Sequence, residues 1–436
     1  MEVQILSRKM IKPSSPTPPH LRNLMLSPID QGAPLAYVPT LFYYPISGSN
    51  GSSRGENIER RKRLETSLSD TLTLFYPLAG RLIKDSHAVD CNDEGIEFLD
   101  AKVDGQLKEL LSRRNDVIGL LNSFTQFDSG SSGSVTAPLV VIQTTMFDCG
   151  GLAIGISICH AIADGFTMVH FVTAWATANR AGINQLTRPD FNLASLFPAK
   201  DLPVVKPDPP PRILGFDKVV TKRFLFDGAK ISILAAKYMA SDQGVRWKPS
   251  RVEVVTSLIW GALIRVSLEK HGRLRNSVVI HSVNLRGKII PAIPDFCCGN
   301  LYRRVIARFM VGRSKWELSD LVSLLRDALS QEIVCRKDVL QTVIRSSSEV
   351  HEELGKEETD VYFFSSWCRF PTYEADFGWG KPSWVSRCSS PCETVFLQDT
   401  ACDNGIEAWV SLNKKDMVQF QQDGDIAAAF SSSEAA

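Results

Sequence analysis

Two apolar runs rich in β-branched residues occupy residues 139–147 and 152–158, and the sequence Asp-Cys-Gly-Gly separates them. This pattern is typical of two buried strands joined by a hairpin turn. Alternate residues lie on one face of an extended strand, so His160 would continue the face of Ile156 and Ile158, and Cys159 would point to the other face. Residues 165–179 then have helical character. The pattern therefore predicts a strand that turns into a helix at His160.

The remaining hydrophobic pattern predicts further strands and helices. Large apolar residues recur every three or four positions between residues 64 and 75, which indicates an amphipathic helix starting near residue 56. Helices are also expected at residues 229–240 and 252–270, and over most of 316–350. Strands are expected at residues 3–11, 35–44, 96–99, 219–226, 277–285, 302–310 and 361–367, with a closing hairpin at 394–400 and 406–412. Because strands and helices do not alternate strictly, the α/β class with mixed sheets and packed helices is favoured over a Rossmann or barrel fold.

Length and proline content predict two domains. A chain of 436 residues is longer than one hydrophobic core usually serves, so two domains of roughly 200 residues each are expected. Seven prolines and few periodic signals mark residues 187–215. We interpret this segment as a linker, which gives an N-terminal domain at residues 1–186 and a C-terminal domain at residues 216–436.

Composition narrows the class of partner. A formal charge of +1 gives no reason to expect nucleic acid or an anionic membrane, so a small-molecule partner is expected. The opening residues mix charges with apolar side chains and soon reach a proline-rich segment, which fits neither a signal peptide nor a membrane span, and a cytoplasmic location is expected. The 10 cysteines are scattered, and Cys297 and Cys298 are adjacent, which suits neither a disulfide framework nor a zinc site. Reduced, mostly buried thiols are therefore expected.

The predicted turn carries His160 and, four positions later, Asp164. A histidine can act as a general base because its unperturbed pKa lies near neutral pH, although the spacing alone leaves open a purely structural histidine. A metal site would need further ligands at suitable positions. A dyad with Cys159 is disfavoured because neighbours on a strand point to opposite faces. The GxSxG, Walker and GxGxxG motifs are absent, so the corresponding catalytic and nucleotide-binding classes lose support.

A second unusual stretch lies at residues 365–382 and combines aromatic side chains with glycines. Gly378 and Gly380 flank Trp379, which indicates a tight loop with special backbone angles. Taken on its residues alone, this stretch is interpreted as a packed aromatic turn.

Together these stretches resemble the plant BAHD acyl-CoA-dependent acyltransferases. The two signature motifs of that family, HxxxDG and DFGWG, stand at residues 160–165 and 376–380, in the family's order and at a matching separation. Similar sequences at residues 76–81, 284–288 and 298–300 extend the resemblance over essentially the whole chain. Residues 12–18 and 26–31 are most similar to the branch that contains vinorine synthase and other alkaloid or alcohol acetyltransferases.

The resemblance implies a two-domain fold of the chloramphenicol-acetyltransferase type, with HxxxDG in the first domain and DFGWG in the second. Residues 187–215 become the crossover, and a solvent channel is expected to run through the domain interface. His160 would remove the proton of an acceptor hydroxyl group, whose oxygen attacks the thioester of acyl-CoA and expels the CoA thiolate. Acyl-CoA, with acetyl-CoA preferred, is then a co-substrate. No tightly bound cofactor or metal is required, and a monomer is expected.

The resemblance also assigns bracing roles to charged residues of both motifs. Asp164 is expected to hold the shape of the turn, either by pairing with an arginine or by capping the helix that begins at Gly165. Asp376 is expected to pair with Arg286 and so to tie two loops together.

Four further positions and one glycine complete the expected site. Trp379, beside Gly378, is expected either to contribute to the oxyanion environment or only to pack. CoA contacts are expected from the second domain, at Ser250, Ser257 and Asn300.

The preferred function is O-acetylation of a hydroxylated plant specialised metabolite, an alkaloid or a terpenoid alcohol. An N-acyltransferase and an enzyme for a longer or aromatic acyl-CoA stay open. So does a catalytically silent homologue that binds a metabolite or a partner protein.

Overall fold

The structure is a computed structural model, and its chain folds into two compact units. The first unit comprises Met1–Pro207, Ile293–Leu301 and Phe370–Cys388, and the second comprises the rest of the chain. The structure describes residues 1–46, 54–83, 86–114, 118–126, 136–198, 213–241, 247–294, 296–312, 316–330, 333–402 and 404–429. Much of the expected linker at residues 187–215 lies outside the described residues.

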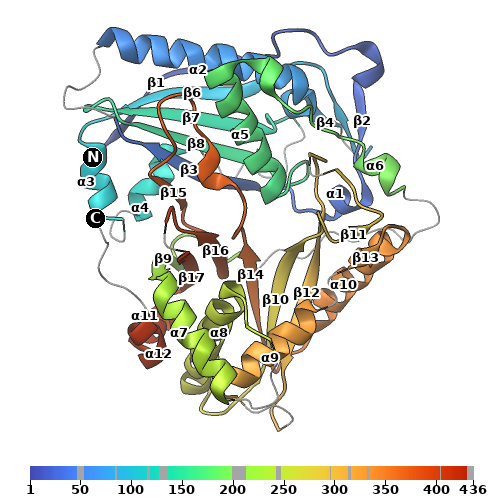
Figure 1. Ribbon diagram of the computed structural model, residues 1–436, viewed down its shortest axis with the longest axis vertical. Helices are drawn as coiled ribbons and strands as arrows, with labels where there is room; N and C mark the ends of the chain where they lie inside the picture. Colours follow the sequence, from blue (N-terminus) through green and yellow to red (C-terminus); the bar gives the residue numbers. More distant parts are fainter. Residues whose placement is uncertain are drawn as a thin grey trace. The chain divides into compact units, whose positions relative to one another are not determined.

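A six-stranded mixed sheet forms the first unit (Figure 1). Its order is β1 (Val3–Ile11), β6 (Ile96–Val103), β7 (Val140–Phe147), β8 (Leu152–Cys159), β3 (Tyr37–Tyr44) and β15 (Trp384–Arg387). The strands β6 and β7 pair in parallel, and the other neighbours in this order pair antiparallel. The predicted hairpin of β7 and β8 is confirmed, with antiparallel pairs from Val140 and Ile158 to Met146 and Leu152.

The central position of β8 explains its composition. Every residue of β8 is buried, as a strand covered on both faces requires. Helices α2 (Arg54–Leu74) and α5 (Gly165–Ala181) lie together in this unit (Figure 1). Leu64, Leu68 and Leu72 recur at helical spacing on α2 and have no exposed surface. The indole N–H of Trp175 on α5 donates to the Leu64 carbonyl oxygen at 3.1 Å, which joins the two helices.

A second six-stranded mixed sheet forms the core of the second unit (Figure 1). Its order is β12 (Tyr302–Phe309), β10 (Asn276–Asn284), β14 (Thr359–Ser366), β16 (Thr394–Asp399), β17 (Ile406–Asn413) and β9 (Val219–Phe226). Val279 on β10 belongs to a large core shared with helices α7, α8 and α9, whereas Val278 and Ile280 pack with Val350 of α10. The alternation along β10 therefore places helices on both faces of this sheet.

The helices of the second unit are α7 (Gly228–Ser241), α8 (Arg251–His271), α9 (Leu318–Leu329), α10 (Val339–Leu354), α11 (Lys414–Gln422) and α12 (Gly424–Ala429). The first unit adds α1 (Pro28–Gly32), α3 (Leu107–Ser112), α4 (Ile118–Leu121), α6 (Leu193–Leu196) and a three-stranded sheet of β2 (Asn23–Met25), β5 (Ala88–Asp90) and β4 (Arg81–Ile83). A short parallel pair, β11 (Ile289–Ile290) and β13 (Val334–Cys335), belongs to the second unit. Single 3₁₀ turns occupy Pro19–Leu21, Tyr76–Ala79, Asn122–Phe124, Ile183–Gln185, Arg336–Asp338 and Thr372–Glu374.

The predicted α/β class with mixed sheets and packed helices is confirmed. The segment expected to be mostly helical, residues 316–350, contains α9 and α10 with β13 between them. No helix in the described ranges is long and apolar enough to cross a membrane.

The two units differ from the expected domains in two segments. Phe370–Cys388, which contains the DFGWG motif, belongs to the first unit and not to the second domain. The reason is β15, which extends the first sheet by pairing with β3. Ile293–Leu301 also belongs to the first unit, where the Cys298 N–H donates to the Asp190 carbonyl oxygen at 2.7 Å.

Candidate active site

The polypeptide turns sharply between β8 and α5, as the sequence predicts. The strand ends at Cys159, and the backbone N–H of His160 donates to the Ala36 carbonyl oxygen at 2.7 Å. A turn follows, closed by the Ile162 N–H on the Cys159 carbonyl oxygen at 3.2 Å. His160 is partly exposed, in contrast to the buried strand before it. The fold therefore presents an imidazole at the end of a rigid central strand.

Asp164 holds this turn by capping α5. Its Oδ1 accepts the backbone N–H of Thr167 at 2.9 Å, and α5 begins at Gly165. Its Oδ2 accepts the backbone N–H of Leu301 at 3.0 Å. The predicted helix cap is thus confirmed, and the same carboxylate fixes the chain segment that carries Asn300. Pairing of Asp164 with an arginine stays a prediction.

The ring of His160 contacts the side chain of Asn300. His160 Nδ1 and Asn300 Oδ1 are 3.0 Å apart. The Asn300 amide nitrogen donates to two oxygen atoms, the His160 carbonyl at 2.7 Å and Asp30 Oδ1 at 3.0 Å. These two acceptors identify the nitrogen end of the amide, so its oxygen end faces the imidazole. An oxygen can only accept, so Nδ1 carries the hydrogen, and the lone pair of the neutral ring lies on Nε2.

Asp30, on the short helix α1, completes this arrangement. Oδ1 accepts the backbone N–H of Asn300 at 2.6 Å in addition to its amide, and Oδ2 accepts the N–H and the hydroxyl of Ser27 at 3.0 and 2.6 Å. The side chain is 4% exposed. Burial raises the pKa of Asp30 to about 6, against the opposing effect of these four donors. The carboxylate is therefore ionised at neutral pH.

Gly299 allows the close approach of Asp30 to the backbone beside Asn300. Its φ of +120° is one that side-chain-bearing residues rarely adopt, and a Cβ there would lie 2.5 Å from Leu193 Cδ1 and 3.3 Å from Asp30 Oδ1. The Thr167 hydroxyl donates to the Gly299 carbonyl oxygen at 2.9 Å. The Cys-Gly-Asn sequence at residues 298–300 is therefore shaped to place Asn300 on His160.

Residues 1–426 match the Transferase family. The chain belongs to the Transferase family. This confirms the resemblance to the BAHD acyltransferases. The chain is 36% identical over 437 residues to acetyl-CoA-benzylalcohol acetyltransferase of Clarkia breweri, with 97% of this chain and 98% of that protein covered. Limonoid 21-O-acetyltransferase of Melia azedarach is 34% identical over 434 residues and 98% of both chains. The crystal structure of vinorine synthase is similar with a TM-score of 0.84, at 30% identity over 99% of each chain.

The second motif of this Transferase family member lies at the other end of α5. Asp376 Oδ2 pairs with Arg180 Nη1 at 3.2 Å, and Oδ1 accepts the N–H groups of Gly378 and Gly380 at 2.8 and 3.0 Å. Within the first unit the partner of Asp376 is Arg180, and the expected pair between Asp376 and Arg286 stays a prediction. Arg286 belongs to the second unit, where it donates to Asn284 Oδ1 at 3.3 Å.

Trp379 packs within this loop. Its ring stacks on Phe377 with a centroid distance of 5.6 Å, and the Arg60 guanidinium lies 4.6 Å from its centre. Asp164 and Arg180 are 16 positions apart, which is roughly 24 Å along a helix. The contacts of Trp379 therefore lie around the end of α5 that is remote from His160, which favours a role in packing, and a part in the oxyanion environment stays a prediction. Gly378, with φ +101°, forms the turn that Asp376 closes.

The three expected CoA contacts have different surroundings. Asn300 is completely buried and contacts Asp30 and His160, and its contact with CoA stays a prediction. Ser250 is the N-cap of α8 and accepts the backbone N–H of Glu253 at 3.3 Å. Ser257 is completely buried on the same helix. For Ser250 and Ser257 a CoA contact stays a prediction.

Burial excludes Cys159 as a nucleophile. The thiol is 4% exposed, and burial raises its pKa to about 11. At neutral pH it is therefore protonated and unreactive. Sequence reasoning missed Asp30 altogether, although its capping box with Ser27 was a readable signal in the run at residues 26–31.

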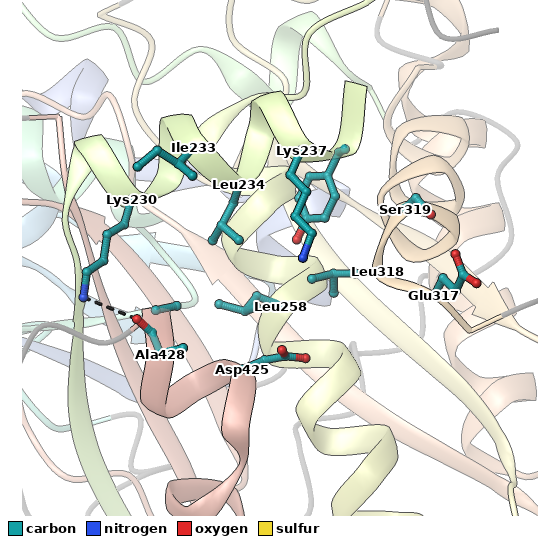
Figure 2. A pocket seen from close by; sticks show the side chains of 12 residues that line it. Lys230, Ile233, Leu234, Lys237, Leu258, Glu317, Leu318, Ser319, Asp425 and Ala428 are labelled. Carbon is teal, nitrogen blue, oxygen red and sulfur yellow. Dashed lines mark hydrogen bonds between the residues drawn. The ribbon is translucent and has the colours of Figure 1, made fainter. Parts of the chain in front are cut away.

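The second unit contains a separate surface pocket of about 460 Å³ among α7, α8, α9 and α12 (Figure 2). Leu234 and Leu258 contribute to its apolar lining. Its two carboxylates have structural partners, because Glu317 forms the capping box of α9 and Asp425 pairs with Arg265 at 2.9 Å. Both carboxylates of this pocket therefore have structural roles.

Proposed function

We propose that the protein is an acetyl-CoA-dependent O-acetyltransferase that modifies a hydroxyl group of a plant specialised metabolite, with His160 as the general base. The observation that carries the proposal is the contact between His160 Nδ1 and Asn300 Oδ1 at 3.0 Å, which leaves Nε2 as the basic atom. The predicted monomeric, cytoplasmic state belongs to the same proposal.

The reaction proceeds in one ternary complex. His160 Nε2 takes the proton of the acceptor hydroxyl group as its oxygen attacks the thioester carbonyl carbon of acetyl-CoA. The resulting tetrahedral intermediate collapses, the carbon–sulfur bond breaks, and the CoA thiolate recovers the proton from the imidazolium. Asn300 Oδ1 accepts from the Nδ1–H throughout and stabilises the charged ring without taking its proton. The acyl group is never attached to the protein.

The names of the relatives support acetyl-CoA as the donor and an alcohol as the acceptor. One relative acetylates benzyl alcohol from acetyl-CoA, and another acetylates O-21 of a limonoid. Because the acceptors of these relatives differ this much, their names do not identify the acceptor of the present chain. A terpenoid or alkaloid alcohol is the preferred class, and other acyl donors or an amine acceptor form the alternatives.

The test is incubation with acetyl-CoA and a panel of terpenoid, alkaloid and aromatic alcohols, with free CoA thiol and acetylated product as readouts. His160→Ala should lower turnover by about 10²–10⁴-fold, the usual value of a general base, without loss of folding. His20→Gln, at an exposed histidine, is the matched control and should keep full activity. If His160→Ala turns over as fast as the wild type, the mechanism is contradicted. If the wild type shows no turnover with any donor and acceptor, the function is contradicted.

A further inference from the structure

Three buried groups form a continuous chain of hydrogen bonds that ends at the partly exposed imidazole of His160. From Ser27 the chain runs to Asp30, from Asp30 to Asn300, and from Asn300 to His160. Ser27 and Asn300 have no exposed surface and Asp30 is 4% exposed. All four residues belong to the first unit, although 270 positions separate Asp30 from Asn300. Such a buried chain is informative because each member restricts the orientation of the next.

The amide of Asn300 could in principle present either its oxygen or its nitrogen to His160. The present orientation points the nitrogen at two oxygen atoms, one of them the Asp30 carboxylate. A flipped amide would set its oxygen against both, and repulsion from an ionised carboxylate makes that orientation unfavourable. Asp30 Oδ1 also holds the backbone N–H of Asn300, so it fixes the position of the residue as well as its orientation.

We propose that Asp30 is a positioning residue of the active site, which acts through Asn300 to hold the His160 imidazole with its hydrogen on Nδ1 and its lone pair on Nε2. This inference rests on the proposed function for its catalytic meaning, but the orientation of the ring is a property of the free protein. Asp30 touches no reacting atom. Its acceptor oxygen defines, through the Asn300 amide, which nitrogen of His160 is the base.

The pKa of Asp30 agrees with this role. Burial raises it to about 6, which leaves the carboxyl group ionised at the pH where His160 must be neutral. All four hydrogen bonds to Asp30 come from donors, so the carboxylate needs no proton to satisfy its neighbours.

The experiment compares three variants by ¹⁵N NMR of histidine-labelled protein without substrate. Asp30→Ala removes the carboxylate that accepts from the side-chain amide and the backbone N–H of Asn300. Asp30→Asn keeps one acceptor oxygen, and Ser27→Ala removes the hydroxyl from the far side of the carboxylate. The signals of His160 are assigned by their loss in His160→Gln. In the wild type at pH 8, Nδ1 should have the shift of a protonated ring nitrogen and Nε2 that of an unprotonated one.

We expect Asp30→Ala to give a mixture of the two tautomers, Asp30→Asn to restore most of the Nδ1–H form, and Ser27→Ala to retain the wild-type spectrum. With acetyl-CoA and an accepted alcohol, kcat should fall about 10–100-fold in Asp30→Ala with little change in the KM for acetyl-CoA, a range seen when an orienting partner of a functional histidine is lost. If Asp30→Ala does not fold, Asp30→Asn and Asp30→Leu provide the same comparison of retained and deleted acceptors.

An unchanged His160 tautomer in folded Asp30→Ala or Asp30→Leu overturns the inference, whether or not the protein is active. A wild type with the hydrogen on Nε2 overturns it as well. A protein that shows the tautomer shift but acetylates no alcohol contradicts the proposed function and leaves the positioning role intact, so the two failures are distinguishable.

Discussion

The two signature motifs sit at opposite ends of one helix, α5, and the two ends are built differently. At the N-terminal end the Asp164 carboxylate is buried, caps the helix and accepts the Leu301 N–H. At the C-terminal end Arg180 is half exposed and pairs with Asp376. The polar groups at the first end surround an accessible imidazole, whereas those at the second close a loop over aromatic rings.

The difference shows that the two motifs have unlike surroundings in this chain. The N-terminal end joins the His160 imidazole, the Asn300 amide and the buried Asp30 carboxylate by hydrogen bonds. The C-terminal end joins α5 to β15 through the loop, since the Asn179 amide donates to the Phe377 carbonyl oxygen at 2.5 Å. Changes at the first end should therefore alter turnover, and changes at the second should alter stability alone.

The largest effect at the C-terminal end is expected from Phe377→Ala. Phe377 has no exposed surface and packs edge-on against Trp175 with centroids 4.8 Å apart. Deleting a buried phenylalanine costs about 3–5 kcal/mol, so the urea midpoint should fall strongly, while the folded fraction keeps its kcat and KM. Trp379→Phe is the milder control, because the indole N–H lacks a hydrogen-bond partner within the described residues and its loss leaves nothing unpaired. A reduced kcat in fully folded Phe377→Ala would break the comparison.

The sequence predicted the strand-to-helix turn because both its signals are local: alternation up to Cys159, and a carboxylate one position before the helix. It also predicted the closing hairpin of β16 and β17. It did not predict the contacts of Asn300 with His160 and Asp30, because they depend on the return of residues 293–301 to the first unit, which no local pattern encodes. Trp379 was uncertain for a similar reason, since only the direction of α5 shows that the two motifs are far apart.

The two carboxylates Asp30 and Asp376 should give stability opposite dependences on pH. Burial raises the pKa of Asp30 from 3.8 to about 6, so the folded state binds more protons between these values and the contribution of Asp30 declines as pH rises through them. Burial tends to raise the pKa of Asp376. The N–H groups of Gly378 and Gly380 and the charge of Arg180 outweigh burial and lower this pKa below 3.8. Its contribution is present above pH 4 and lost as pH falls below the unfolded value.

Urea unfolding measures the free energy of unfolding of the wild type and of Asp30→Asn at each pH. The wild-type value minus the Asp30→Asn value should fall by on the order of 3 kcal/mol between pH 4 and pH 7. The wild-type free energy of unfolding minus that of Asp376→Asn should stay constant from pH 5 to pH 7 and decline only in more acidic buffer. The same pH profile for both variants would show that the two ends of α5 do not differ electrostatically.

Asp164→Ala should affect both stability and turnover. Loss of the helix cap costs about 1 kcal/mol, and the buried Leu301 N–H left without its acceptor adds about 1–3 kcal/mol. The segment carrying Asn300 then loses one of its anchors, so kcat should fall as well. Asp164→Asn keeps an acceptor for Thr167 and should recover part of the stability. Full turnover in Asp164→Ala would show that the cap does not support the site.

The smallest effect is expected from Arg180→Ala. The pair between Arg180 and Asp376 is half exposed, with side-chain exposures of 51% and 22%, and such pairs contribute about 0–1 kcal/mol. The loop keeps its two backbone hydrogen bonds to Asp376 Oδ1, so its shape should persist. Any loss should disappear in 1 M salt, because screening already removes the attraction in the wild type. A larger loss that survives high salt would mean that Arg180 supports the loop by packing on Gly378, where its Cγ would lie 3.6 Å from an added Cβ, and not by charge.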